Sequence, residues 1–392
     1  MAETKWVLTD VDQGIFVDEI TLDSTQLGRA ANQCRVSKQR LHGGLTAGVD
    51  QIEVDNGVCA FTVIPTRGMG VRRASVSDLR LGWDAPVKGP VHPQFVPLME
   101  PSGLGWLDGF DELVVRCGLE SNGAPVFDEQ GTLTYPLHGR IANRPAHQVS
   151  VAADTHSGEI TVHGVVDETR FHFLKLRISS EIKTRPGEQG FRITDRIENL
   201  SDSPAEAQIL YHVNYGSPLL DAGAQLVAPV RTVVPRDAVA ATGIDHWNDY
   251  LAEQPGFQEE VYFFELAADN NNNTQVVLKN GHGLQGVCMS FNTQQLPCFT
   301  VWKNTNGKSD GYVTGLEPGS NFPNPRPFEG KHGRVISLLP RESKTFDLQI
   351  EGLLTPDQVQ AAARQVAKIQ ADIPPQILRE PRADWCGAPP PL

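Results

Sequence analysis

Four short segments carry polar side chains at points where the surrounding chain has the pattern of β-strands. They are TRGMGVRR at 66–73, PLHGRIANRPAH at 136–147, YHVNYGSPLL at 211–220 and TGLEPGSNFPNP at 314–325. Their histidines and glutamate are residue types that exchange protons with a bound molecule near neutral pH. Taken singly, each has an ordinary explanation, since His212 ends an apolar strand and Glu317 precedes a proline in a turn. The segments therefore indicate acid–base chemistry only if the fold brings them together.

The elements that must position these segments are mostly β-strands. Short runs rich in β-branched and aromatic residues recur between turn signals, and several alternate apolar with polar side chains. No regular alternation of strand and helix implies a parallel sheet, so we predict a large antiparallel β-sandwich. The runs lie at 59–65, 148–153, 159–166, 191–199, 207–214, 274–280, 335–340 and 344–353.

One helix is expected near the end of the chain. Thr355 is a natural N-cap, Pro356 suits the first helical position, and apolar residues follow at helical spacing until Pro374. We divide the chain into an N-terminal extension (1–24), one β-sandwich domain (25–354), and a C-terminal helix with a Pro-rich tail (355–392). The tail is either a loose terminus or an arm that packs on a neighbour.

Composition excludes several classes of protein. The 392 residues are 40% hydrophobic and 21% charged, and no stretch approaches the ~18 consecutive apolar residues of a membrane span. The net charge of -13 argues against a nucleic-acid partner, because phosphates are held by clustered Lys and Arg. Acidic residues stand near the N-terminus, where a secretory signal needs a basic start, so we expect a cytoplasmic protein.

The six cysteines do not form a recognisable metal or disulfide framework. They are widely spaced and include no C-x-x-C pair, which favours buried, reduced thiols over a zinc ribbon or disulfides.

In their order along the chain, the polar segments resemble those of the aldose 1-epimerase (galactose mutarotase-like) superfamily, and in particular its DUF4432 group. The resemblance covers about residues 25–355 and rests on PTRGMGV, LHGRIANRPA, YHVNYGSPLL and GLEPGSNFPNPR. Its most specific part is the Gly-x-Glu-Pro turn followed by a short strand that ends in Leu-Pro-x-Glu. The resemblance implies an all-β fold, a large antiparallel β super-sandwich with a short C-terminal helix, and an enzyme that interconverts the anomers of a sugar.

The resemblance also implies roles for three residues. Glu317 would be the general base, ionised near neutrality because it sits exposed on a turn, and His212, with an ordinary pKa of about 6.5, would be the acid. His138 would bind and polarise the ring or anomeric oxygen. We expect the three side chains to line one open pocket, without a cofactor and without a metal.

Further residues are predicted to bind the sugar. Arg67 and Arg140 are competing candidates for the sugar-binding arginine, because the Gly-Arg and His-Gly elements are fused here, whereas known mutarotases separate them. Trp302 is the first-ranked aromatic residue, and Trp106 a lesser one, because aromatic faces stack on sugar rings. The string Leu-His-Gly-Gly at 41–44 also matches the His-Gly-Gly string of the family, but it precedes the first strong strand, so we do not predict His42 as a site residue. The full set of predicted substrate-binding residues is Arg67, Arg140, Asn143, Asn214 and Trp302.

Two other functions fit the same residues. A carbohydrate-binding protein without turnover would keep the cleft, and a metal-dependent sugar isomerase or epimerase would use His138, His212 and Glu317 as ligands. Arg140, Arg144 and His147 stand close together in an acidic protein, which suggests a positive patch that favours an acidic sugar.

Overall fold

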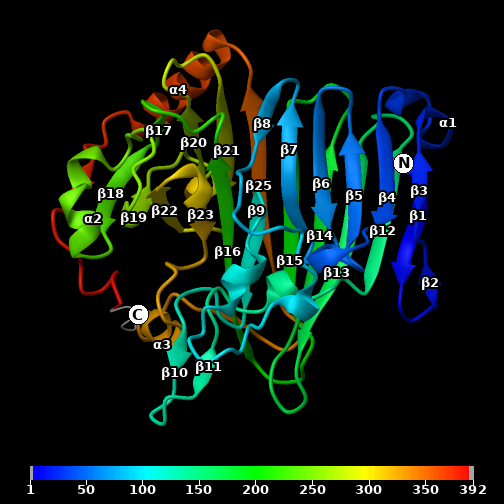
Figure 1. Cartoon of the computed structure of the whole chain (residues 1–392), viewed down its shortest axis with the longest axis horizontal. Coiled ribbons are helices and arrows are strands. Elements are labelled where there is room, and N and C mark those ends of the chain that lie inside the picture. The colour runs from blue at the N-terminus through cyan, green and yellow to red at the C-terminus, as the bar shows by residue number, and fades with distance from the viewer. Residues whose placement is uncertain (1–2, 388–392) are drawn as a thin grey trace.

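The protein is built mainly from two large β-sheets. The computed structural model describes residues 3–387, so residues 1–2 and 388–392, which include parts of the predicted extension and tail, lie outside the described residues. All strand pairs are antiparallel except the pair of β18 and β26 (Figure 1). This arrangement confirms the predicted all-β super-sandwich.

The first sheet has ten strands and contains most of the predicted alternating runs. In spatial order it consists of β17 (Gln225–Val227), β20 (Asn273–Lys279), β21 (Gly286–Asn292), β25 (Ser343–Leu353), β15 (Gly190–Asn199), β14 (Lys175–Thr184), β13 (Ile160–Thr169), β12 (Gln148–Asp154), β1 (Glu3–Asp10) and β2 (Ile15–Phe16). Strand β1 pairs along its length with β12, so the stretch expected as an N-terminal extension contributes a strand to this sheet.

The second sheet has fourteen strands and carries the polar segments. In spatial order it consists of β26 (Gln376–Ile377), β18 (Val230–Pro235), β19 (Glu260–Leu266), β22 (Cys298–Thr305), β23 (Tyr312–Gly319), β16 (Ala205–Gly216), β9 (Val114–Leu119), β7 (Gly70–Val76), β6 (Cys59–Ile64), β5 (Asp50–Asp55), β4 (Arg35–Arg40) and β3 (Ile20–Leu22), with β24 (Ile336–Leu338) beside β16 and β8 (Leu79–Leu81) beside β7.

Short elements complete the described chain. A hairpin of β10 (Val126–Phe127) and β11 (Leu133–Tyr135) projects from the body (Figure 1). The α-helices are α1 (Ser24–Leu27), α2 (Ala238–Thr242), α3 (Arg326–Lys331) and α4 (Pro356–Gln370). Helix α4 confirms the predicted C-terminal helix, because the Thr355 hydroxyl accepts from the backbone N–H of Gln358 while the Gln358 side chain accepts from the N–H of Thr355.

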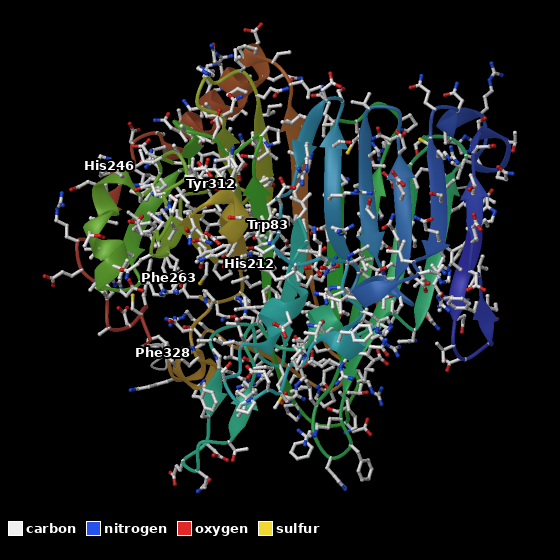
Figure 2. The ribbon with its side chains drawn as sticks, in the orientation of Figure 1. Trp83, His212, His246, Phe263, Tyr312 and Phe328 are labelled. Atoms are coloured by element: carbon white, nitrogen blue, oxygen red, sulfur yellow. The ribbon has the colours of Figure 1, made fainter. Side chains whose placement is uncertain are left out.

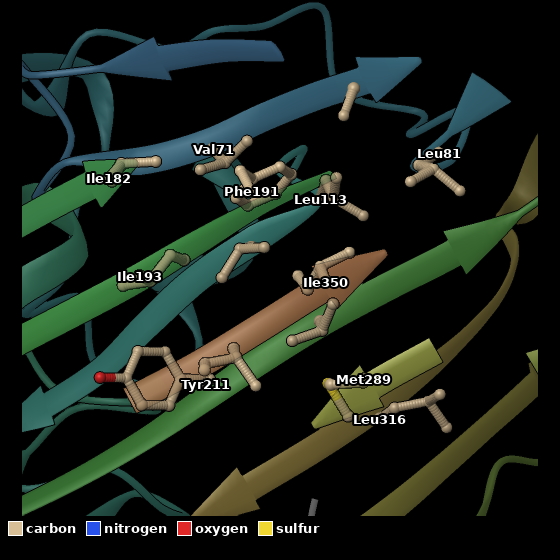
Figure 3. Close-up of a cluster of buried hydrophobic side chains, with 14 of the residues drawn as sticks. Val71, Leu81, Leu113, Ile182, Phe191, Ile193, Tyr211, Met289, Leu316 and Ile350 are labelled. Atoms are coloured by element: carbon tan, nitrogen blue, oxygen red, sulfur yellow. The ribbon is translucent and has the colours of Figure 1, made fainter. Parts of the chain in front are cut away.

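The main hydrophobic core lies between the two sheets. Alternate side chains of each strand point into it, among them Tyr211 and Leu316 from the second sheet and Phe191 and Ile350 from the first (Figure 3). Because strand side chains alternate, the neighbouring residues of β16 and β23 must face away from this core. That outer face of the second sheet is where the polar segments meet.

A buried ion pair joins the sheets through the core. Arg116 of β9 reaches Asp195 of β15, with Nε at 2.5 Å from Oδ2 and Nη2 at 3.0 Å from Oδ1. The Tyr211 hydroxyl donates to the same carboxylate at 2.8 Å, and the Arg116 and Asp195 side chains are fully buried. The pair therefore fixes how β9 sits against the opposite sheet.

Removing one member of this pair should strongly destabilise the protein. Asp195→Ala leaves a buried, uncompensated guanidinium, and we expect the free energy of unfolding to fall by about 3–5 kcal/mol in denaturant titrations. The matched control is Asp202→Ala, which breaks an exposed pair with Arg341 and should change stability by less than about 1 kcal/mol. Equal effects of the two substitutions would contradict this account of the core.

Candidate active site

His212 and Glu317 lie directly opposite each other on neighbouring strands. Strands β16 and β23 pair in a register that sets 210 against 319 and 213 against 316, which brings 212 opposite 317. The Nε2 atom of His212 lies 3.2 Å from Oε1 of Glu317. Figure 2 shows His212 near the middle of the molecule, beside these strands. The fold thus brings together two of the three predicted catalytic residues.

The alternation of strand side chains assembles the rest of this face. Asn214 follows His212 by two positions on β16, Gly315 precedes Glu317 by two positions on β23, and Trp302 pairs with Gly315 from β22. A Cβ atom at Gly315 would lie 2.7 Å from Oε1 of Glu317 and 2.9 Å from Cε1 of His212. Glycine is therefore required at position 315 for the histidine and the carboxyl group to meet.

Asn214 determines which nitrogen of His212 carries the proton. Its Nδ2 donates to the backbone carbonyls of Glu112 and His212, at 3.0 and 3.2 Å, so its Oδ1 faces Nδ1 of His212 at 2.7 Å. An amide oxygen only accepts, so Nδ1 is the protonated nitrogen. In neutral His212 the lone pair on Nε2 then points at Glu317 and accepts a hydrogen bond from its protonated carboxyl group.

Burial changes the expected ionisation of both groups. The side chains of His212 and Glu317 are only 6% and 3% exposed. Desolvation raises the pKa of Glu317 to about 8, with the Glu259 carboxylate adding to the rise, and holds the pKa of His212 well below its usual value. The expectation of an exposed, ionised Glu317 on a turn is wrong, because this residue is buried within a strand. Near neutrality the pair holds one proton, on the carboxyl group.

His138 lies beside the pair on a loop. Its ring is 5.4 Å from that of His212, centroid to centroid, and its backbone adopts the left-handed conformation with φ at 55°. Its Nδ1 lies 3.0 Å from the backbone carbonyl of Asn122, which only accepts, so Nδ1 carries a proton and Nε2 is left as an acceptor. Burial lowers the pKa of His138 to about 4, so the ring is neutral at physiological pH.

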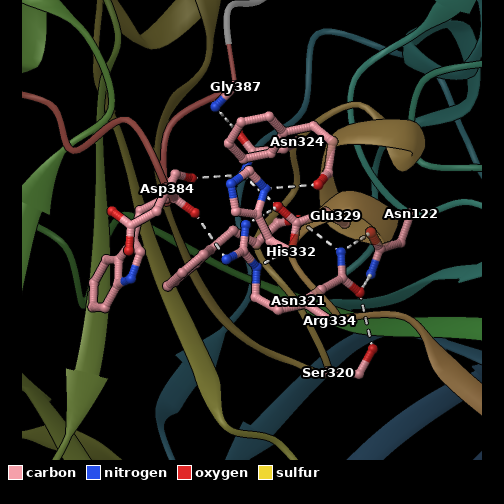
Figure 4. A network of polar contacts seen from close by, with 12 residues as sticks. Asn122, Ser320, Asn321, Asn324, Glu329, His332, Arg334, Asp384 and Gly387 are labelled. Atoms are coloured by element: carbon pink, nitrogen blue, oxygen red, sulfur yellow. Dashed lines mark hydrogen bonds and ion pairs between the residues drawn. The ribbon is translucent and has the colours of Figure 1, made fainter.

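Two asparagines connect the His138 loop to the strand of Glu317. Asn122 and Asn321 exchange side-chain hydrogen bonds, with Nδ2-to-Oδ1 distances of 2.9 and 2.8 Å, and the Ser320 hydroxyl donates to Asn321 (Figure 4). Asn122 and Asn321 are fully buried. This reciprocal amide pair keeps His138 and Glu317 at a fixed separation.

Aromatic rings enclose the acid–base pair. Phe110 and Trp302 lie 5.2 and 5.5 Å from the ring of His212, and Trp106 lies 4.6 Å from that of His138. Trp106 and Phe110 come from the segment around the 3₁₀ helix η4 (Gly105–Gly109), which covers the outer face of the sheet. Aromatic rings therefore surround the acid–base pair on several sides.

Arg67 and Asn143 lie beneath this aromatic layer. Arg67 is fully buried, its Nε lies 2.6 Å from Oε1 of Glu112, and its Nη1 donates to Oδ1 of Asn143 at 2.7 Å. Because the carbonyl of Glu112 holds Asn214, these two predicted sugar-binding residues reach the acid–base pair through Glu112. The hydrogen bonds of Arg67 and Asn143 are thus made to protein groups, and through Glu112 they help to hold Asn214 in place.

The other basic residues of the 136–147 segment face elsewhere. Arg140 has Met99 as its side-chain contact, with Nη2 at 3.6 Å from Sδ, and lines a small hollow with Arg144, Glu120 and Glu168. His147 pairs with Asp167 at 3.3 Å. Each of these side chains thus has an acidic neighbour, and the structure does not bring them to His212 and Glu317.

Two residues of the site escaped the sequence analysis. Glu259 accepts from Nε1 of Trp302 at 2.8 Å and from Nη2 of Arg236 at 3.0 Å, which ties both residues to the rim of the site. No motif marks Glu259 and Arg236, since each lies just outside a strand, Arg236 after β18 and Glu259 before β19. Within residues 3–387, no three His, Cys, Asp or Glu side chains form a group that could hold a metal ion.

The C-terminal tail completes the wall beside Trp302. Trp385 packs against Phe322 in a tilted arrangement with the ring centroids 4.8 Å apart, and its carbonyl accepts from Nδ2 of Asn324 at 2.7 Å. The N–H of Gly387 donates to Oδ1 of Asn324 (Figure 4). Trp302 packs against the same cluster. The described part of the tail is thus an arm that packs on its own chain.

Comparison with known proteins identifies the relatives of this chain. The family DUF4432, a domain of unknown function, matches residues 46–351. No curated protein matches the chain. Among residues 3–387, no helix is both long and apolar enough to cross a membrane.

Solved structures share the fold over most of the chain. A Klebsiella pneumoniae protein, provisionally named an aldose 1-epimerase, is 37% identical, with a TM-score of 0.92 over 96% of this chain and 98% of its own. A galactose mutarotase-like protein of Clostridium acetobutylicum is 13% identical, with a TM-score of 0.54 over 82% and 98% of the two chains. An Escherichia coli K12 protein, also provisionally named an aldose 1-epimerase, is 16% identical, with a TM-score of 0.53 over 78% and 100%.

The raised pKa of Glu317 makes stability depend on pH. Between the ordinary carboxyl pKa of about 4.5 and the folded value of about 8, the folded state retains a proton that the unfolded state has lost, so stability falls as pH rises. The depressed pKa of His212 has the opposite effect below pH 6.5, where the unfolded state binds a proton that the folded state does not, so stability rises with pH there. From pH 6.5 to 8 we expect wild type to lose about 1–2 kcal/mol more than Glu317→Gln in denaturant titrations.

The control for this comparison is Glu265→Gln. Glu265 is 50% exposed and pairs with Arg231, so its removal should leave the pH dependence of wild type intact. Parallel pH profiles for wild type and Glu317→Gln would refute the buried, protonated carboxyl group.

Proposed function

This chain belongs to the DUF4432 family and has the mutarotase-like fold, and we propose that it is a sugar epimerase-like enzyme that interconverts anomers by acid–base catalysis. The observation that carries the proposal is the His212–Glu317 pair, 3.2 Å apart, holding one proton between an acceptor nitrogen and a carboxyl group. Anomer exchange needs one base and one acid and leaves the proton count unchanged. A pair that shares one proton meets that requirement.

The proposed reaction begins with the proton on His212. When a sugar enters, the proton shared by the pair moves from Glu317 to Nε2 of His212, which leaves a carboxylate and an imidazolium. Glu317 takes the proton of the anomeric hydroxyl, C1 becomes a carbonyl, and the bond from C1 to the ring oxygen breaks. His212 protonates the ring oxygen as it leaves. The pair still holds one proton, now on the carboxyl group.

Closing the ring reverses these transfers. After rotation about the bond between C1 and C2, the former ring oxygen attacks the other face of the carbonyl and returns its proton to His212. Glu317 returns its proton to the carbonyl oxygen, which becomes the anomeric hydroxyl of the opposite configuration. Catalysis of both directions by the same two groups follows from microscopic reversibility.

The remaining groups orient the sugar in this proposal. Neutral His138 presents Nε2 as an acceptor for a hydroxyl next to the reacting carbon, in place of the polarising role that the resemblance implied. Asn214 holds the tautomer of His212, and Trp302 offers an aromatic face on the same side of the sheet. Arg67 and Asn143 brace Glu112 and, through it, Asn214.

Substitution of the pair tests the proposal. We expect Glu317→Gln to abolish catalysed anomer exchange, measured by NMR exchange spectroscopy on a panel of free sugars, while sugar binding persists because shape is kept. His212→Asn should lower the rate by about 10²-fold or more. His42→Asn is the control, since His42 is exposed in a loop before β5, and should leave the rate within about 2-fold.

Two outcomes favour the other functions. Sugar binding with no anomer exchange in wild type identifies a carbohydrate-binding protein. An exchange rate that falls on chelation with EDTA and returns with a divalent cation identifies a metal-dependent isomerase. An equal loss of activity in His42→Asn and His212→Asn would contradict the assignment of His212.

A further inference from the structure

We infer that Arg236, Glu259 and Trp302 form a subsite for the hydroxyl groups of an uncharged sugar, and that Glu259 is the residue that selects against acidic sugars. This inference rests on the proposed function, because it names the class of sugar that the His212–Glu317 pair would act on. We refer to these three residues as the rim triad.

Three neighbouring strands fix the geometry of the rim triad. Arg236 directly follows β18, Glu259 directly precedes β19, and Trp302 lies on β22 opposite Val261. Strand β19 pairs with both β18 and β22, with Pro235 opposite Tyr262 and Trp302 opposite Val261, so the three residues lie near the same end of three adjacent strands. Asp237, which caps helix α2, accepts from Nε of Arg236 at 2.9 Å and holds the guanidinium from its other side. The subsite is therefore preorganised by backbone pairing.

The rim triad retains free hydrogen-bonding capacity. Glu259 Oε2 accepts from Trp302 and Oε1 accepts from Arg236, which uses one acceptor position of each oxygen. A carboxylate has about four such positions, so about two are left, and the Glu259 side chain is 49% exposed. Vicinal sugar hydroxyls are donors of the right kind for those positions, and the indole face of Trp302 suits the apolar face of a sugar ring.

The rim triad opens toward the acid–base pair. The Trp302 ring is 5.5 Å from that of His212. Burial dominates the pKa of both groups, raising that of Glu317 and lowering that of His138; the Glu259 carboxylate contributes upward to each, and Arg236 opposes it at Glu317, so the rim and the pair share one electrostatic environment. A sugar with its anomeric carbon at Glu317 would place its remote hydroxyls at this rim.

The charges at the rim disfavour an acidic substrate. The single guanidinium of Arg236 is shared by two carboxylates, Glu259 and Asp237. A uronate or phosphate group at the rim would be repelled by these two carboxylates, and the one guanidinium beside them is already paired. The repulsion would weaken binding of an acidic sugar. Arg140 and Arg144, which suggested an acidic sugar from the sequence, line a hollow with Glu120 and Glu168. An uncharged sugar meets no such penalty.

The test compares neutral sugars with their uronates. Using D-glucose, D-galactose and the corresponding uronates, we expect wild type to exchange the neutral anomers with a kcat/KM at least about 10-fold higher than that of the uronates. Glu259→Gln should narrow this difference to about 3-fold or less, by raising KM for the neutral sugars and lowering it for the uronates. The control is Glu265→Gln, at a residue of β19 that is 50% exposed and pairs with Arg231, and it should leave the preference unchanged.

Measuring sugar binding to the Glu317→Gln variant tests this inference independently of the proposed catalytic function. Calorimetric titration of that variant with the same four sugars should show the same preference without any turnover. A neutral preference in binding with no exchange in wild type refutes the enzyme but supports the rim triad. Three outcomes would overturn the proposed role of the rim triad. They are equal exchange rates for neutral sugars and uronates, a preference that Glu259→Gln leaves unchanged, and binding of none of the four sugars.

Discussion

The register between β16 and β23 is the constraint on which the site depends. Because 210 pairs with 319 and 213 with 316, His212 and Glu317 are cross-strand neighbours on the face that points away from the core. A slip of one residue would turn both side chains into the packed layer that contains Tyr211 and Leu316. The inward-facing residues of the same strands therefore hold the outward-facing ones in place, and core packing and site geometry are two consequences of one pairing.

Burial then converts two ordinary side chains into a coupled pair. In water a glutamate and a histidine ionise independently, but at a few per cent exposure the cost of desolvating charge favours the neutral forms of both. Asn214 removes the remaining freedom by fixing the tautomer, so Nε2 of His212 faces the carboxyl group as an acceptor. The pair is thus described by its shared proton rather than by two separate pKa values.

The fold could be predicted from strand and turn patterns, whereas the central pair was implied by the resemblance of the polar segments to a known family. The predicted runs correspond to strands β6, β12, β13, β15, β16, β20, β24 and β25, and the Thr-Pro-x-Gln start of α4 has a capping chemistry that acts locally. Glu317 was misjudged because the Gly-x-Glu-Pro string is typical of a turn, whereas the paired strands on both sides keep it extended. Glu259 and Arg236 were missed because only the tertiary meeting of β18, β19 and β22 brings them to Trp302.

The central claim, that the pair shares one proton held on Glu317 near neutral pH, is tested most directly by infrared difference spectroscopy. Subtracting the spectrum of Glu317→Gln from that of wild type isolates the carboxyl group of Glu317. The account predicts the carbonyl band of a protonated carboxylic acid at pH 6.5, which gives way to carboxylate bands as the pH passes about 8. Carboxylate bands already complete at pH 6.5 would contradict it.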